Sequence, residues 1–268
     1  MTVRTMASLA DRPDVGAVGY PRVLVIVPAY NEEANLPRTL ADLRTLSGLV
    51  NFEVVVVDDG STDSTSKVAI AHGVACVRLP FNLGIGGAVQ TGLLYAIERG
   101  YDIAIQFDAD GQHLAGEIPR LLMPLLNEDA QVVVGSRFRG RGEFRSTHTR
   151  RIGIVLLSRV VCFLCRQTFT DVTSGFRAFN KEAIEFLGAT YPCDYPEPET
   201  LVLLNRNGFR LTEVAVEMRS RQLGHSSIRG LAPLYYMLRV MLALFMNRVR
   251  KRESNFLRST QRLKDAHS

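Results

Sequence analysis

Two aspartates stand directly after a buried strand in the segment AIQFDADGQH, residues 104–113. Asp108 and Asp110 are two residues apart on a turn, so both carboxylates can face one ion, and the carbonyl of Gln112 has the same parity. Carboxylates this close together are costly unless a proton or a cation neutralises them. Mg²⁺ and Mn²⁺ prefer oxygen ligands, and Mg²⁺ usually shares its coordination shell with phosphates. Turns and helix caps also produce D-x-D patterns, so this segment alone is weak evidence for a metal site.

Acidic residues also follow two other expected strands. Asp58 and Asp59 end the run FEVVVVDDGS, and Glu32 follows RVLVIVPAY. Continuous apolar runs separated by helical segments predict an α/β fold with a mostly parallel sheet covered on both faces. The carboxyl ends of such strands meet at one edge, where ligands bind. We therefore expect acids from separate segments to converge on one site.

The expected elements alternate along the first half of the chain. Apolar runs predict strands at 22–30, 52–58, 74–80, 102–107 and 130–137, and 3.6-residue spacing predicts helices at 32–46, 86–100 and 117–127. The glycines of NLGIGGAVQTG, residues 82–92, do not have the spacing of a dinucleotide fingerprint. They favour a helix that begins close to the sheet or to a ligand.

Six motifs together resemble glycosyltransferase family 2. They are VPAYNEEANL, VVVVDDGSTDST, FNLGIGGAVQTG, DADGQH, VGSRF and DVTSGFRAF. Within the family, they look most like the polyprenyl-phosphate (dolichol-phosphate) sugar synthases. The resemblance covers about residues 22–230 and implies a GT-A fold, Rossmann-like with flanking helices. It also implies a nucleotide-diphosphate-sugar donor and Mg²⁺ or Mn²⁺.

The resemblance assigns roles to individual residues. It places a metal and diphosphate site at Asp108, Asp110 and Gln112, and a phosphate contact at Arg137. A loop that closes over the donor would include Arg221 and Ser226, although Ser227 stands where the family usually has lysine. The residues expected around the nucleotide are Pro28, Tyr30, Glu32, Val57, Asp59 and Ala109.

The acceptor is either a sugar hydroxyl or a lipid phosphate, and the two need different chemistry. A hydroxyl needs a general base, whereas a phosphate monoester, with a second pKa of about 6, needs positive charge to hold it. Arg137 and Arg177 are the expected catalytic cations, with Arg139, Arg141 and Ser174 nearby. Asp171 is either the base of a hydroxyl-acceptor enzyme or a group that orients Arg177, and we favour the second.

Charge and hydropathy indicate a membrane surface. The net charge is +5, and residues 248–264 hold seven Lys or Arg against one Glu. We expect a flexible tail at 1–21, a catalytic domain at 22–230 and an amphipathic interfacial helix with a basic tail at 231–268. The apolar segment 152–165 is expected beside this helix. The alternatives are buried core helices, or docking onto a small membrane-spanning subunit.

The resulting prediction is a peripheral enzyme on the cytoplasmic face of the membrane. It would transfer a sugar, with inversion, from a nucleotide-diphosphate-sugar to polyprenyl phosphate for cell-envelope glycan or glycoconjugate assembly, with no nucleic-acid partner. A family 2 enzyme that builds polysaccharide on a sugar hydroxyl is the alternative. A phosphate-accepting receiver domain is a second alternative, but it would be near 120 residues long, whereas this chain has 268. A non-catalytic subunit that binds nucleotide sugar is a third, and the intact metal-site acids argue against it.

Overall fold

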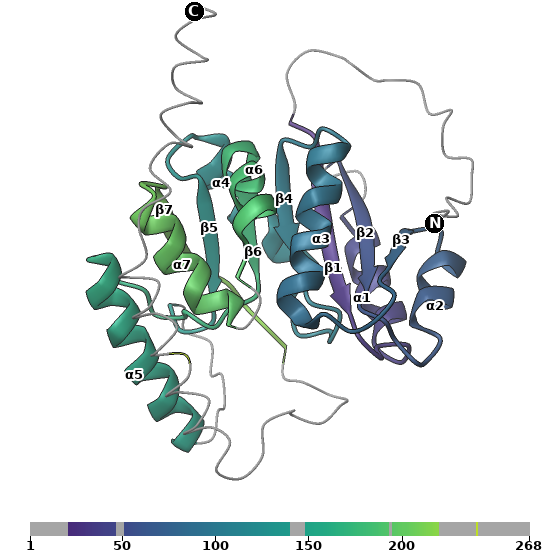
Figure 1. Cartoon of the computed structure of the whole chain (residues 1–268), viewed down its shortest axis with the longest axis horizontal. Coiled ribbons are helices and arrows are strands. Elements are labelled where there is room, and N and C mark those ends of the chain that lie inside the picture. Colours follow the sequence, from purple (N-terminus) through teal and green to yellow (C-terminus); the bar gives the residue numbers. More distant parts are fainter. Residues whose placement is uncertain (1–20, 47–50, 140–147, 193–194, 220–239, 241–268) are drawn as a thin grey trace, which may run out of the picture.

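The computed structural model describes residues 21–46, 51–139, 148–192, 195–219 and 240, and from residue 148 to 154 the backbone only. Its strands form a single sheet in the order β3-β2-β1-β4-β6-β5-β7 (Figure 1). The strands are β1 (Val23–Ala29), β2 (Phe52–Asp58), β3 (Ala75–Arg78), β4 (Ile103–Gln106), β5 (Val132–Ser136), β6 (Arg177–Asn180) and β7 (Leu211–Ala215).

The prediction of a mostly parallel sheet is confirmed. Strand β1 pairs in parallel with β2 and β4, β2 with β3, and β5 with β7. Strand β6 is the exception, because it runs antiparallel to both β4 and β5 and separates them. The sequence analysis did not predict this strand, which begins inside the DVTSGFRAF motif. Its insertion brings residues 174–177 to the same edge as the aspartates that follow β4.

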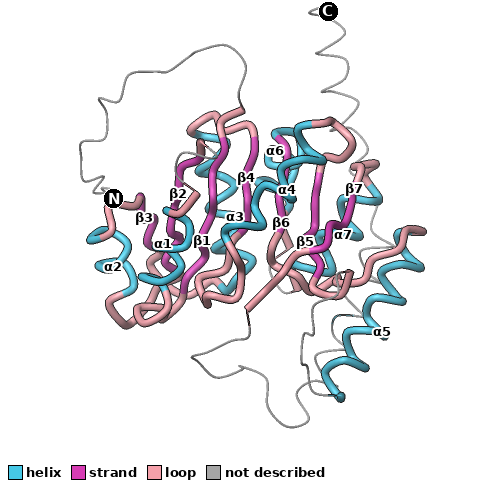
Figure 2. Tube along the Cα trace, turned by 180° about the vertical axis from the view of Figure 1, so that it is seen from behind, coloured by secondary structure: helices cyan, strands magenta, loops and turns pink. Residues whose placement is uncertain are grey.

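Helices cover both faces of the sheet. Figure 1 shows α3, α6 and α7 in front of the strands, and Figure 2, from behind, shows α1 and α4 on the opposite face. The helices are α1 (Leu36–Arg44), α2 (Thr65–Ala71), α3 (Gly84–Glu98), the 3-10 turn η1 (Ala115–Glu117), α4 (Ile118–Leu126), α5 (His148–Cys165), α6 (Lys181–Thr190) and α7 (Pro196–Arg206).

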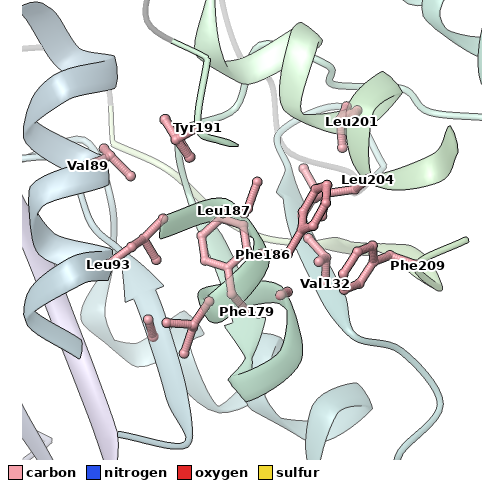
Figure 3. Close-up of a cluster of buried hydrophobic side chains, with 14 of the residues drawn as sticks. Val89, Leu93, Val132, Phe179, Phe186, Leu187, Tyr191, Leu201, Leu204 and Phe209 are labelled. Carbon is pink, nitrogen blue, oxygen red and sulfur yellow. The ribbon is translucent and has the colours of Figure 1, made fainter. Parts of the chain in front are cut away.

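The two covered faces explain why the strands are apolar without alternation. Every residue of β1 is buried. Leu24 and Ile26 pack into the cluster under α3, α6 and α7, whereas Val25 and Val27 pack into the cluster under α1 and α4. Figure 3 shows the first cluster, in which Phe179 of β6 lies among side chains of α3 and α6. Burial on both sides fixes which way each strand-end residue points.

The segments at the two chain ends lie largely outside the described residues. This applies to the predicted tail, of which only Pro21 is described, and to the predicted interfacial segment 231–268, of which only Val240 is described. Val240 is fully buried and belongs to the same core cluster as Leu157 and Val161 of α5. The C-terminal segment therefore contacts the core at this residue.

Gly92 lets α3 lie close to the sheet. A Cβ atom at this position would be 2.3 Å from Cγ2 of Ile26 in β1. We predict that Gly92→Ala lowers the free energy of unfolding by roughly 1–3 kcal/mol, because the core must rearrange around the added methyl group. Urea denaturation measures this change. Glu98→Ala, at an exposed position of the same helix, is the control and should change stability by less than about 0.5 kcal/mol; equal effects would contradict the prediction.

Candidate active site

The loops that follow β1, β2 and β4 lie together at the carboxyl edge of the sheet. The register aligns Ala29 with Asp58, and the Asp59 N–H donates to the carbonyl of Ala29 at 2.9 Å. On the other side of β1, the Phe107 N–H donates to the carbonyl of Ile26, also at 2.9 Å. These contacts extend the ladder to the start of each loop. The acidic segments therefore meet at one edge, as the strand pattern predicts.

The two aspartates after β2 accept hydrogen bonds that hold neighbouring loops and helices in place. Asp58 is 1% exposed; it accepts hydrogen bonds from the Ser61 N–H at 2.9 Å and from the Ser66 hydroxyl. Asp59 is also buried and accepts the N–H groups of Leu83 and Gly84, at 2.7 and 2.9 Å, where α3 begins. Burial raises the pKa of Asp59 above its ordinary value despite these two hydrogen bonds. Asp59 thus fixes the N-terminus of α3 at the site.

The residues expected around the nucleotide differ in exposure. Pro28 and Val57 are register partners inside the sheet, and both are buried. Tyr30 is 46% exposed at the end of β1. Glu32 is half-buried, and its carboxylate accepts a hydrogen bond from the Asn35 side chain at 2.7 Å. Ala109 is buried, so only Tyr30 and Glu32 among these five present side chains to solvent.

The D-x-D-x-Q segment forms a tight turn. Gly111 adopts a left-handed conformation with φ of 73°, which glycine adopts without strain. The Gln112 N–H donates to Oδ1 of Asp110 at 3.0 Å, and the Gln112 carbonyl accepts the Arg219 N–H at 2.8 Å. The backbone oxygen of Gln112 thus has one hydrogen-bond partner and keeps a second lone pair. The Asp108 side chain is 32% exposed, so its carboxylate remains accessible.

His113 supports Asp108, a role that the sequence analysis missed. It is buried, stacks on Phe176 with ring centroids 4.6 Å apart, and its Nδ1 accepts the Asp108 N–H at 3.0 Å. The proton of the neutral ring must then be on Nε2, which lies 3.7 Å from Oδ2 of Asp108. Burial lowers the pKa of His113 although Asp108 and Asp110 oppose this change. A histidine directly after D-x-D-x-Q was the available signal.

Arg137 lies opposite these acids at the end of β5. Its Nε and one terminal nitrogen donate to the two oxygens of Asp171, at 2.6 and 2.7 Å, and the same terminal nitrogen donates to Thr173 at 2.9 Å. Burial would lower the pKa of Arg137, but the hydrogen bond and charge of Asp171, with Asp108 and Asp110, raise it. The guanidinium is therefore a permanent cation beside the D-x-D acids.

This pairing corrects the role expected for Asp171. The carboxylate is fully buried and orients Arg137, not Arg177 as the sequence analysis favoured. Both of its oxygens accept hydrogen bonds from Arg137, a geometry that suits an arginine fork. A fully buried carboxylate that is bound in this way is poorly placed to accept a proton from an acceptor hydroxyl.

Arg177 is the first residue of β6 and is fully buried. Its guanidinium donates to the carbonyls of Ser174 at 2.8 Å and Val172 at 3.3 Å, and its other terminal nitrogen has no hydrogen-bond partner among the described residues. Burial lowers its pKa, although Tyr191 and other acidic groups, Asp108 among them, oppose this change. A ligand could contact this guanidinium only after its surroundings move.

Three of the predicted site residues lie outside the described part of the chain. Arg221, Ser226 and Arg141 belong to the segments that the structure does not describe. Within the described segments, no group of three or more His, Cys, Asp or Glu side chains could hold a metal ion. No helix in this part of the chain is long and apolar enough to cross a membrane.

Comparison with known proteins identifies the family. Residues 24–188 match the family described as Glycosyl transferase family 2. The chain is 32% identical over 216 residues to the UDP-N-acetylglucosamine–dolichyl-phosphate N-acetylglucosaminyltransferase of Methanococcus voltae, covering 73% of this chain and 84% of that one. It is 34% identical over 226 residues to the undecaprenyl-phosphate mannosyltransferase of Micrococcus luteus, covering 78% and 88%.

A solved structure agrees with this result. Glucosyl-3-phosphoglycerate synthase from Mycobacterium tuberculosis, crystallised with Mn²⁺, UDP and phosphoglyceric acid, superposes with a TM-score of 0.62 at 25% identity, covering 85% of this chain and 78% of that one. The fold is thus that of the GT-A glycosyltransferases, as predicted. Fold, motifs and matched length together show that the chain is a glycosyltransferase and belongs to glycosyltransferase family 2.

Proposed function

We propose that this enzyme transfers a sugar, with inversion, from a nucleotide-diphosphate-sugar to a polyprenyl phosphate. The pairing of Arg137 with Asp171 carries the proposal. It offers a fixed cation beside the D-x-D acids and engages the carboxylate that a hydroxyl acceptor would need as a base. A phosphate monoester is already a nucleophilic anion near neutral pH, since its second pKa is about 6. The names of the Methanococcus and Micrococcus relatives support the same acceptor class.

The donor would bind across the carboxyl ends of β1, β2 and β4. The exposed Tyr30 and the half-buried Glu32 would contact its nucleoside, while the buried Pro28, Val57, Asp59 and Ala109 would shape the wall behind them. Arg221 and Ser226 are proposed to close over the donor. The buried Asp59 contributes by holding the first turn of α3 in place. A panel of donor sugars would identify the nucleobase and the sugar.

The residues present fit a divalent cation bound together with phosphates. Asp108 and Asp110 offer two carboxylates and Gln112 an amide, which is a set that Mg²⁺ or Mn²⁺ accepts when substrate phosphates complete the shell. The bound ion would supply Lewis-acid stabilisation of the leaving diphosphate. The relative from Mycobacterium tuberculosis has been crystallised with Mn²⁺ and UDP and also with Mg²⁺ and UDP. His113 and Gln106 hold Asp108 ready for this role through hydrogen bonds at 3.0 and 3.3 Å.

Arg137 would hold the acceptor phosphate for in-line attack. Its cationic form is stabilised by Asp171, which already accepts hydrogen bonds from Nε and one terminal nitrogen, so Arg137 would act on the phosphate chiefly through its positive charge. Arg177 would act mainly through its charge, because its guanidinium is fully buried and donates to the carbonyls of Ser174 and Val172. The two arginines together offset the negative charge that two phosphate-bearing substrates bring to this edge.

The surface of α5 supports a peripheral position at a membrane, which we propose to be on the cytoplasmic face. Leu156, Val160 and Phe163 follow one another at helical spacing; Leu156 and Phe163 are 48% and 83% exposed. The exposed Arg159 and Arg166 flank this stripe. Apolar side chains beside basic ones suit the interface of an anionic leaflet. Figures 1 and 2 show α5 at the β7 end of the sheet, far from α2.

The acceptor class is tested directly by product analysis. We expect the enzyme with Mn²⁺ and undecaprenyl phosphate to form a lipid-linked sugar from one member of a panel of UDP-, GDP- and dTDP-sugars, detected by thin-layer chromatography and mass spectrometry. Asp110→Asn should abolish turnover but leave the circular dichroism spectrum unchanged, because Asp110 is only half-buried and lies on a turn outside the helices and strands. Glycosylation of free saccharides alone would contradict the proposal.

Gly175 gives a specific test of metal binding at Asp108. A Cβ atom at this position would lie 2.7 Å from Oδ2 of Asp108 and 2.9 Å from Nε2 of Gln106. We expect Gly175→Ala to displace the carboxylate and to raise the Mn²⁺ concentration for half-maximal activity about tenfold, a loss of about 1.4 kcal/mol. Gly116→Ala is the matched control, since nothing lies within 4 Å of its added methyl group. An unchanged Mn²⁺ requirement in Gly175→Ala would argue against metal binding at Asp108.

The proposed membrane contact predicts a difference between two exposed apolar residues. Phe163→Ser should weaken binding to phosphatidylglycerol-containing vesicles by about tenfold, because burying a phenylalanine contributes roughly 1.5–3 kcal/mol. Ile70→Ser removes a side chain that is 66% exposed on α2 and should leave vesicle binding unchanged. Co-sedimentation with vesicles measures both. Identical losses in the two variants would rule out α5 as the contact.

A further inference from the structure

A chain of hydrogen bonds connects Arg137 to the edge strand β7. Its first step is the contact with Asp171, which lies in the loop between α5 and β6. Its second step is Glu213 of β7, whose Oε1 accepts the Asp171 N–H at 2.8 Å. The register places Glu213 beside Val134, three residues before Arg137 on β5. Arg137, directly after β5, and Glu213 of β7 are thus connected through neighbouring strands.

Glu213 also holds the preceding residue. The Thr170 N–H donates to both carboxylate oxygens of Glu213 at 3.0 Å, and the Thr170 hydroxyl donates to Oε2 at 2.9 Å. The same hydroxyl lies 2.7 Å from the hydroxyl of Ser136, the residue before Arg137. Glu213 therefore fixes the loop that contains Asp171. Through Thr170 it also contacts Ser136, the residue directly before Arg137.

The Glu213 carboxylate is buried and depends on its hydrogen bonds to residues 170 and 171. The residue is 5% exposed, and no described Lys, Arg or His side chain forms an ion pair with its carboxylate. A buried carboxylate is costly unless hydrogen bonds satisfy it. Glu213 instead has four hydrogen bonds from residues 170 and 171. Charge-assisted bonds of this kind are stronger and more directional than neutral ones, so the loop has one favoured position.

We propose that Glu213 is a positioning residue for the acceptor phosphate, acting through Asp171 on Arg137. The inference rests on the proposed function, in which Arg137 holds that phosphate. Without Glu213 the loop at 170–171 loses its anchor, and Asp171 no longer fixes the direction of the guanidinium. The donor site is supported separately, because Asp108 is held by His113 and Gln106.

The test compares acceptor and donor kinetics in Glu213→Gln and Glu213→Ala. With farnesyl phosphate as the acceptor probe, we expect KM for this lipid to rise about tenfold or more, with a larger rise for alanine. KM for the donor sugar nucleotide, the Mn²⁺ requirement and the rate of donor hydrolysis without acceptor should each stay within about twofold. Glu217→Gln, an exposed glutamate just beyond β7, is the matched control and should match wild type.

If the glutamate variants do not fold, Thr170→Val tests the same proposal. Thr170→Val removes the hydroxyl between Glu213 and Ser136 without a change of charge, and it should raise KM for farnesyl phosphate in the same selective way. Equal changes in donor and acceptor KM, or a fall in kcat at constant acceptor KM, would overturn the role of Glu213. If wild type itself forms no lipid-linked sugar, the proposed function fails and the inference fails with it.

Discussion

The electrostatic balance between Arg137 and three carboxylates is the interaction on which the site depends. Asp171 binds the guanidinium directly, and Asp108 and Asp110 act on it through space. A cation held here lowers the cost of keeping two aspartates together on one turn. In the proposed reaction, it also leaves a positive charge where the acceptor phosphate would approach. The D-x-D acids and Arg137 are therefore electrostatic neighbours, although different side chains hold them in place.

The sheet provides the rigid frame for these charges. Strands β1, β2 and β4 present the acids from their carboxyl ends, and β5 presents Arg137. The antiparallel β6 joins the two groups, because it pairs with β4 on one side and β5 on the other. The turn before β6 packs against Asp108 at Gly175, while the loop further back binds Arg137 through Asp171. One connection thus contacts both Asp108 and Arg137.

The support of the site comes from residues that are distant in sequence. His113 and Gln106 hold Asp108, whereas Glu213 holds the loop of Asp171. Each supporting side chain is buried, and each forms at least one hydrogen bond to the residue that it supports or to that residue's loop. Such contacts restrict the orientation of the functional side chains, which a catalytic site requires. The same loop follows α5, so the acceptor side adjoins the helix with the exposed apolar stripe.

The amino-acid sequence by itself determined the family, the α/β fold, the parallel strands and the edge at which Asp108 and Asp110 lie. These features follow from local patterns: apolar runs, strand ends and short motifs, each of which lies within a few residues. The tertiary structure alone decided that Asp171 pairs with Arg137, that β6 is antiparallel, and that Arg177 is buried. Asp171 is 34 residues from Arg137 along the chain, and Thr170 and Asp171 are 43 and 42 residues from Glu213. Only the packing of loops around the sheet selects among such partners, because spacing along the chain does not constrain them.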